Sequence, residues 1–322
     1  MRSVKVSSPE SRNEKATRSE VNGLGNGTFR ETEFHQYEVA PKLPGLDIEI
    51  RNPDMPRGVM KFALFDFDGT VSLIRAGWQD VMIPMLVEKL AELDSGETQE
   101  ELYAIVEDFV VTLTGKQTIY QMMRLAEEIE ERGGEPQDPV AYKREYLQRL
   151  WERIKGRIEG VRDGTFTQEQ MRVPGSLELV QELAARDVQL YLASGTDIEY
   201  VQAEAELVGV AEYFGPRIYG AVDKYETFSK KMVIEQILSE NDLHGPELCA
   251  FGDGYVEILN VKEVGGVAVG AATDEYKRAG INEWKRNRLV QAGADVIVPE
   301  FREYKELVGY LMAEGRAEDA VP

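Results

Sequence analysis

Two aspartates, Asp66 and Asp68, follow the short apolar run "VMKFALF" (residues 59–65). Side chains alternate along an extended chain, so the two carboxylates point to roughly the same side. Carboxylates that lie this close repel each other unless a cation sits between them or one of them is protonated. Carboxylate oxygens suit Mg²⁺, and a carboxyl group with a raised pKa can act as a general acid. The pair therefore predicts metal-assisted or acid–base chemistry.

The apolar run before these aspartates resembles a strand that is buried on both faces, and four later runs share this character: residues 188–194, 248–253, 265–271 and 295–298. Helical patterns lie between them, for instance over residues 175–187 and 229–238. Such alternation predicts an α/β fold with a Rossmann-like, doubly wound parallel sheet as its core. The carboxyl ends of the strands form the ligand crevice of such sheets, and Asp66 and Asp68 fall at one of these ends.

The long stretch between the first two predicted strands has almost no strand signal. It contains four helical patterns, over residues 76–93, 98–113, 117–134 and 138–158. An insertion of this kind is best interpreted as a small helical bundle. We therefore predict a flexible tail over residues 1–45, an α/β core made of residues 46–72 and 171–322, and an all-helical insertion over residues 73–170. The tail prediction rests on a polar composition without a sustained period.

Four short motifs occur in order along the chain, each at a predicted strand end or helix start. They are "KFALFDFDGT", "LYLASGT" with Ser194, "FSKKMVIEQIL" with its two lysines, and "AFGDGYVE" with Gly252, Asp253 and Glu257. With these four motifs in this order, the sequence resembles the haloacid dehalogenase-like hydrolase superfamily over about residues 58–310. The helical insertion after the first motif is similar to the helical (C1-type) cap of its phosphatase branch.

The resemblance implies a role for each motif residue. Asp66 would attack phosphorus and form an aspartyl-phosphate, and Asp68 would act as general acid and then general base. Mg²⁺ would be held by Asp66, the backbone carbonyl of Asp68 and Asp253, with Glu257 orienting the metal or its waters. Ser194 and a lysine would meet the phosphoryl oxygens. Three further residues of these motifs are expected to bind substrate: Gly69, Thr70 and Gly195.

Two lysines compete for the third motif. Lys230 falls near the centre of the apolar face of its helix and Lys231 falls to one side, which favours Lys230. Outside the motifs, Lys116 lies in a break between two helices of the insertion, and Arg75 follows the first motif. We expect both to contact substrate, and Lys116 would meet a second anionic group, although a solvated loop lysine is an equally good interpretation.

The composition limits the partners. A net charge of −21 argues against a nucleic-acid partner, which requires clustered lysine and arginine. No apolar run is long enough to span a membrane, and the polar N-terminus does not resemble a secretory signal. The single cysteine, Cys249, fits a reducing compartment, so we expect a cytoplasmic protein.

These observations favour a Mg²⁺-dependent phosphatase that hydrolyses a small phosphate monoester, the ester of a phosphorylated metabolite. A sugar phosphomutase of the same superfamily is the main alternative, although "LIRAGW" after the first motif lacks the histidine that such mutases typically carry. A non-catalytic protein that binds a phosphorylated ligand is the third possibility. The sequence leaves the oligomeric state and the identity of the substrate open.

Overall fold

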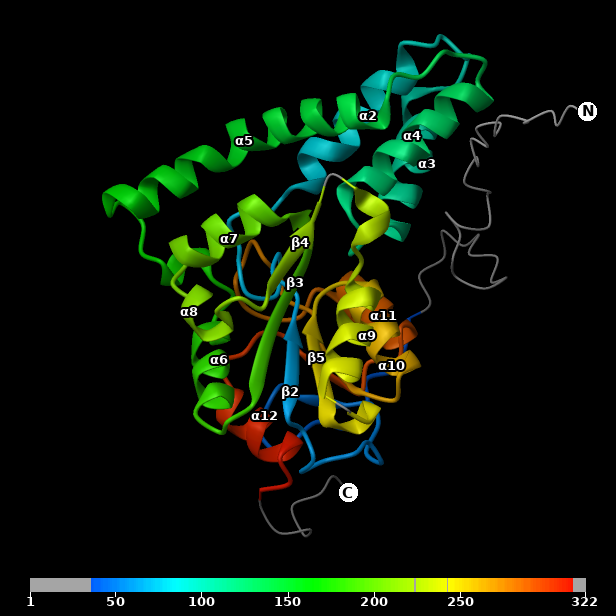
Figure 1. Cartoon of the computed structure of the whole chain (residues 1–322). Coiled ribbons are helices and arrows are strands. Elements are labelled where there is room, and N and C mark those ends of the chain that lie inside the picture. Colours follow the sequence, from blue (N-terminus) through cyan, green and yellow to red (C-terminus); the bar gives the residue numbers. More distant parts are fainter. Residues whose placement is uncertain (1–35, 223, 242, 315–322) are drawn as a thin grey trace, which may run out of the picture. The chain divides into compact units, whose positions relative to one another are not determined.

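The computed structural model describes residues 36–222, 224–241 and 243–314. Within these ranges the core is a seven-stranded sheet with the strand order β1-β7-β6-β5-β2-β3-β4 (Figure 1). Neighbouring strands are parallel, except that β1 runs antiparallel to β7. The strands are β1 (Glu49–Ile50), β2 (Phe62–Phe65), β3 (Gln189–Asp197), β4 (Ile218–Ala221), β5 (Leu248–Gly252), β6 (Val267–Ala271) and β7 (Val296–Val298).

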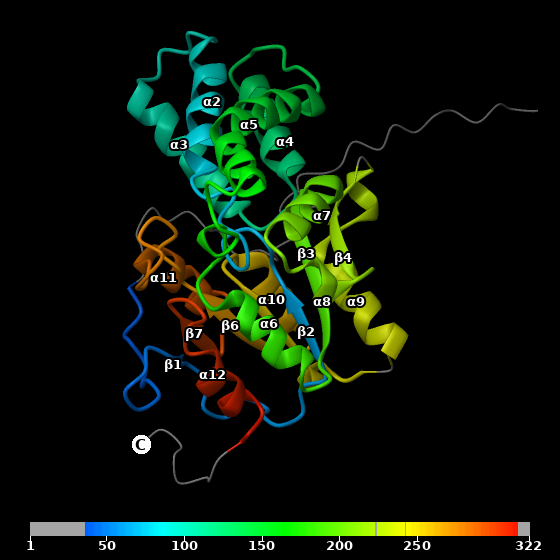
Figure 2. The ribbon, with the colours of Figure 1, turned by 90° about the vertical axis from the view of Figure 1, so that its left-hand side faces the viewer.

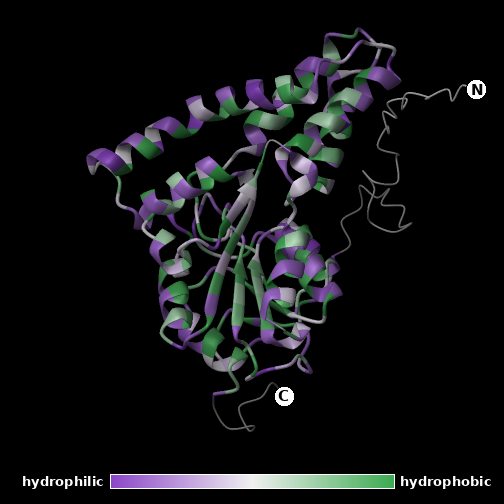
Figure 3. Ribbon diagram, in the orientation of Figure 1, coloured by the Kyte–Doolittle hydropathy of each residue, from purple (hydrophilic) through white to green (hydrophobic). Residues whose placement is uncertain are grey.

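Both faces of this sheet are covered by helices, as Figure 2 and the hydrophobic strands of Figure 3 show. Along β2, Phe62 and Leu64 belong to one hydrophobic cluster, and Ala63 and Phe65 belong to the other. One face packs against α6 (Ser176–Ala184), α7 (Ile198–Leu207), α8 (Ala211–Phe214) and α12 (Tyr304–Leu311). The other packs against α9 (Lys230–Asn241), α10 (Tyr255–Glu263) and α11 (Glu283–Gln291). The predicted doubly wound α/β class is confirmed.

All five predicted strands are present, but β1 and β4 were not predicted. β1 has only two residues, and β4 (IYGA) has only two apolar residues before Gly220, so neither offers an unbroken apolar run that could be recognised from its composition. Both lie at the edges of the sheet, where a strand has a single pairing neighbour.

The chain between β2 and β3 forms four long helices, as predicted: α2 (Gln79–Ala91), α3 (Gln99–Thr112), α4 (Thr118–Glu131) and α5 (Pro139–Asp163). Thr98 and Glu101 form the expected capping box at the start of α3. Asp138 caps α5, and Gly164 ends it in a left-handed conformation with φ of 82°. We call residues 79–163 the helical insertion. None of the helices in the described ranges is both long and apolar enough to cross a bilayer.

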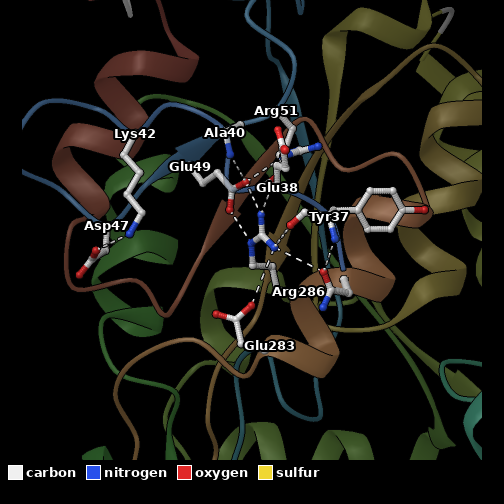
Figure 4. A network of polar contacts seen from close by, with 10 residues as sticks. Tyr37, Glu38, Ala40, Lys42, Asp47, Glu49, Arg51, Glu283 and Arg286 are labelled. Carbon is white, nitrogen blue, oxygen red and sulfur yellow. Dashed lines mark hydrogen bonds and ion pairs between the residues drawn. The ribbon is translucent and has the colours of Figure 1, made fainter. Parts of the chain in front are cut away.

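Part of the predicted flexible tail packs against the core. The Tyr37 amide donates to Asn287 Oδ1 at 3.1 Å, and the Ala40 amide donates to Glu49 Oε1 at 2.8 Å. Arg286 of α11 donates to both carboxylate oxygens of Glu49 and to the backbone carbonyls of Tyr37 and Glu38 (Figure 4). The segment before β1 is thus bonded to α11, whereas residues 1–35 lie outside the described part of the chain.

Candidate active site

The carboxyl ends of β2, β3 and β5 lie side by side and bring the motif residues together. Asp66 continues β2, because its amide donates to Phe251 O of β5 at 2.9 Å. The turn that follows contains Gly69 with φ of 78°. A Cβ atom at Gly69 would lie 2.2 Å from Asp253 Oδ2, so only glycine allows this approach. The turn therefore sets the first and fourth motifs against each other.

Lys230 joins two of the motif carboxylates. Its Nζ lies 2.8 Å from Asp66 Oδ1 and 2.9 Å from Glu257 Oε2, and all three side chains are buried. Lys231 instead points away from the site and pairs with Glu263 at the surface. The predicted placement of Lys230 on the inward face of α9 is confirmed, while its role stays a prediction.

Burial and charge set the protonation of this group. Burial raises the pKa of Asp66 well above its usual value; Lys230 opposes this shift, whereas Glu257 and Asp253 add to it. Burial acts to lower the pKa of Lys230, but the carboxylates of Asp66 and Glu257 outweigh it and raise that pKa. Lys230 therefore stays cationic near neutral pH and supplies a fixed positive charge beside Asp66.

Three carboxylates are placed so that they can share a cation. One oxygen each from Asp66, Asp253 and Glu257 lies within 4.8 Å of the others. An all-oxygen donor set of this kind fits Mg²⁺ better than a softer metal. The carboxylate of Asp68 is not part of this group; the resemblance implies that Asp68 meets the metal through its backbone carbonyl, and that role stays a prediction.

Asp253 is held by a residue that the sequence analysis missed. Lys285 Nζ of α11 lies 2.6 Å from Asp253 Oδ2 and 2.5 Å from Glu275 Oε1. The paired carboxylates outweigh the effect of burial and raise the pKa of Lys285. Lys285 lies outside the four motifs, in the basic run "EWKRNR", and nothing in that run distinguishes it from its neighbours.

Asp68 is anchored through one oxygen only. Its Oδ2 accepts hydrogen bonds from Ser194 Oγ at 3.1 Å and Thr196 Oγ1 at 2.9 Å. Its Oδ1 is buried and has no hydrogen-bond partner within the described residues; the nearest cation, Arg75 Nε, is 3.9 Å away. Asp68 therefore keeps one oxygen available while two hydroxyl groups fix its orientation.

Arg75 is less free than a substrate-binding residue would be. Its Nη2 lies 2.7 Å from Glu204 Oε1, and its Nε donates to both oxygens of Glu204 at 3.1 Å. Its guanidinium also lies over the ring of Tyr200, 5.3 Å from the centroid. Glu204, on α7, belongs to no motif. Glu204 thus engages the Nε edge of Arg75, which approaches Asp68 Oδ1 only to 3.9 Å, and substrate contact by Arg75 stays a prediction.

Two of the predicted substrate-binding residues are committed to the turn after β2. The Gly69 amide donates to Ser72 O at 2.9 Å, so it is not free to bind a phosphate. Thr70 is fully buried, and its hydroxyl has no hydrogen-bond partner among the described residues. Neither residue lines the pocket over Asp66. Their placement indicates a structural contribution, whereas substrate binding by either stays untested.

The break between α3 and α4 reaches the site and places Lys116 in the lining of the pocket, while substrate contact by Lys116 stays a prediction. A Cβ atom at Gly195 would lie 2.5 Å from Lys116 O, so the glycine of the second motif leaves room for this loop. Gln117 Nε2 donates to the carbonyls of Tyr225 at 2.9 Å and Phe228 at 2.7 Å, which fixes the loop against the segment before Lys230. The insertion and the core thus meet directly above the motif residues.

A pocket of about 90 Å³ lies between the insertion and the carboxyl ends of the strands. Its core side includes Asp66, Asp68, Ser194, Gly195, Lys230 and Asp253. Trp78, Met82, Lys116 and Tyr146 contribute to its other side. Burial lowers the pKa of Lys116, and no ion pair holds its amine within the described chain. The pocket is therefore small, lined by charge on one side, and mixed in polarity on the other.

The family model of the haloacid dehalogenase-like hydrolases matches residues 60–265. The chain therefore belongs to this family, and the prediction of an enzyme is confirmed at this level. Among proteins with a curated description, none matches the chain significantly.

Solved structures that are similar to this chain come from several bacteria. β-Phosphoglucomutase from Clostridium difficile has 12% identity and a TM-score of 0.52, covering 79% of this chain and 98% of its own. At this identity the likeness shows a shared fold alone. A predicted phosphoglycolate phosphatase from Haemophilus somnus has 16% identity and a TM-score of 0.49; the match covers 77% of this chain and 97% of that protein. CbbY from Rhodobacter sphaeroides, solved with phosphate, has 18% identity and a TM-score of 0.47; the match covers 76% of this chain and 96% of that protein.

Proposed function

We propose that this chain is a Mg²⁺-dependent phosphatase that hydrolyses a small phosphate monoester through an aspartyl-phosphate on Asp66. The observation that carries the proposal is the arrangement around Asp66. Lys230 lies at one of its oxygens, two further carboxylates lie within reach of a shared cation, and Asp68 stands beside it with one unbonded oxygen. Family membership agrees with hydrolysis, while the metal and the substrate class belong to the proposal.

In the first half of the proposed reaction, a carboxylate oxygen of Asp66 attacks phosphorus while the bond from phosphorus to the ester oxygen breaks. Asp68 gives a proton to the departing oxygen through Oδ1, because Oδ2 is already engaged by Ser194 and Thr196. In the second half, Asp68 takes a proton from water, and the oxygen of that water attacks phosphorus while the bond from phosphorus to the Asp66 oxygen breaks. The products are the alcohol and inorganic phosphate, and both aspartates return to their starting state.

Fixed positive charge supports this transfer. Lys230 is buried and held by Asp66 and Glu257, so it needs little reorganisation as charge develops on the phosphoryl oxygens. Asp66, Asp253 and Glu257 would hold Mg²⁺, with Lys285 orienting Asp253. Bound there, the metal would offset the charge of the phosphoryl group, so that an anionic nucleophile can approach it.

The helical insertion would act as the cap of this site. It contributes Met82 and Tyr146, which together with Trp78 just before α2 exclude water, and Lys116, whose amine is available to a second anionic group on the substrate. A pocket of about 90 Å³ favours a compound with a short carbon skeleton. The proposed substrate is therefore a small phosphorylated metabolite.

The test is phosphate release from a panel of small metabolite phosphates, with Mg²⁺ and with a chelator, for wild type and Asp66→Asn. Release that needs the metal and is lost in the variant would support the proposal and name the substrate class. Full activity in Asp66→Asn would exclude the mechanism. A sugar phosphate that isomerises without net phosphate release would indicate the phosphomutase alternative, and binding without turnover would indicate a non-catalytic phosphate-binding protein.

A cytoplasmic location is also a proposal. It rests on the single cysteine, Cys249, which is buried and unpaired and so suits a reducing compartment. Fractionation of the native cells with an antibody against this chain would test it.

A further inference from the structure

A second and larger hollow lies between the helical insertion and the core. It has a volume of about 290 Å³ and runs between α5 and α7, where Figure 1 shows the second half of α5 crossing over α7. We call it the α5–α7 groove. It is separated from the pocket over Asp66 by the Arg75–Glu204 pair, because Arg75 lines both hollows and Glu204 lines the groove alone.

The lining of the groove is mainly apolar. Leu150, Ile154 and Ile158 present one side of α5 to it and are at most 5% exposed. Two aromatic side chains on opposite helices also line it, Trp151 of α5 and Tyr200 of α7. These are 42% and 43% exposed, although large aromatic side chains are normally covered in a core. The groove thus offers a closed apolar side and accessible aromatic surface.

The lining of the groove contains two arginines but one carboxylate, so one positive charge is left over. Arg75 and Glu204 neutralise each other at its inner end. Arg162, near the end of α5, is exposed and forms no ion pair with the described residues. The net charge of −21 repels anions at long range, but screening limits that effect, and the guanidinium of Arg162 supplies a local positive charge in the lining. An arginine can bind a carboxylate or sulfonate through two parallel hydrogen bonds.

We propose that the α5–α7 groove binds a small organic anion with an apolar ring or chain, at a site distinct from the pocket over Asp66. Ligand sites are typically hollows of roughly 300–1,000 Å³ that are lined by apolar and aromatic side chains and a few polar groups. The apolar part of the ligand packs between Ile154 and Tyr200, and its anionic group pairs with Arg162. This site does not depend on the proposed phosphatase activity.

The experiment uses 1-anilinonaphthalene-8-sulfonate as the probe, with the full chain, Mg²⁺ and saturating inorganic phosphate. Its fluorescence and the energy transfer from tryptophan report binding. Ala203→Phe would fill the groove from the exposed side of α7, and Arg162→Gln would remove the cation. We expect the Kd to rise about tenfold or more for the first variant and about fivefold for the second.

Two variants serve as matched controls. Gln202→Phe adds the same ring at the neighbouring exposed position of α7, and Arg144→Gln removes an exposed arginine of α5; neither residue lines the groove. We expect both to leave the Kd within about twofold of wild type. Circular dichroism and thermal unfolding confirm that each variant is folded.

Three results would overturn the proposal. The first is an unchanged Kd in both groove variants. The second is binding of the probe only when inorganic phosphate is omitted, which would place the probe in the pocket over Asp66. The third is a dimer in sedimentation experiments that Ala203→Phe dissociates, which would make the groove an interface between two copies of this chain.

Discussion

The core contains two buried groups of ion pairs that differ in their balance of charge. One joins Arg286 to Glu49, and the other joins Lys230 to Asp66 and Glu257. Arg286 and Arg51 face Glu49 and Glu283, so the signs balance. Arg286 also donates to two backbone carbonyls, which leaves little of its guanidinium unused (Figure 4).

The second group is not balanced. Asp66, Glu257, Asp253 and Glu275 outnumber Lys230 and Lys285, which pair with them. Burial raises the pKa of Asp66 most, and repulsion from the neighbouring carboxylates of Glu257 and Asp253 raises it further. Such an arrangement costs stability unless a cation binds, whereas the Arg286–Glu49 group is complete in itself. The difference indicates which group holds the structure together and which is arranged for a ligand.

The largest expected effect is that of Asp66→Asn. It removes the proposed nucleophile, so we expect kcat to fall by at least about 10³-fold. Because it also removes one charge from an excess of carboxylates, the free energy of unfolding should be unchanged or slightly higher without Mg²⁺. Steady-state kinetics measures the change in kcat, and urea denaturation measures the change in the free energy of unfolding. A large loss of stability would mean that Asp66 is a structural partner of Lys230.

Glu49→Gln should have the opposite profile. It breaks a buried pair and leaves Arg286 without its carboxylate, so we expect the free energy of unfolding to fall by about 3–5 kcal/mol. The kcat of the molecules that remain folded should stay within about twofold of wild type. As a control, the double variant Glu49→Leu with Arg286→Met should recover much of the stability, since no uncompensated charge remains. A double variant as unstable as Glu49→Gln would contradict the view that the lost stability comes from an unpaired buried charge.

Lys230→Met should reduce kcat by about 10²-fold, because it removes a fixed charge from the phosphoryl site. Lys231→Met is the matched control on the same helix; its amine pairs with Glu263 at the surface, and we expect activity within about twofold of wild type. Steady-state kinetics on the same substrate compares the two variants. Equal losses in both would contradict the assignment of Lys230.

The smallest expected effect is that of Lys285→Met. Lys285 orients Asp253, and residues that orient a metal ligand typically contribute about tenfold or more to affinity. We therefore expect the Mg²⁺ concentration at half-saturation to be about tenfold higher in the variant than in wild type. Calorimetry on the phosphate-free protein and the Mg²⁺ dependence of activity both measure it. A lower concentration would show instead that Lys285 competes with the metal for Asp253.

The sequence predicts the class of the fold well, and it also predicts that the motif residues meet at one edge of the sheet, because both depend on local patterns. The apolar runs that end in Asp66, Ser194 and Asp253 are strands, and parallel strands bring their carboxyl ends to one edge. Helical spacing likewise placed Lys230 on the inward face of α9. These are one-dimensional signals with a direct structural consequence.

The residues that hold Arg75 and the motif residue Asp253 in place were not predictable in the same way. Glu204 and Lys285 lie far along the chain from Arg75 and Asp253, and no spacing links the members of either pair. Arg75 therefore looked like a free cation in the sequence, although its guanidinium is held by Glu204. Pairings of this kind depend on how helices pack against the sheet, which local patterns do not encode.

The central claim is that Asp66 carries the phosphoryl group during turnover. The most direct measurement is to quench the enzyme during steady-state turnover, reduce it with borohydride and map the peptides by mass spectrometry, because borohydride converts an aspartyl-phosphate to homoserine. The account predicts homoserine at position 66, dependent on substrate and absent in Asp66→Asn. Continuous phosphate release with Asp66 unmodified, or a modification at another residue, would contradict it.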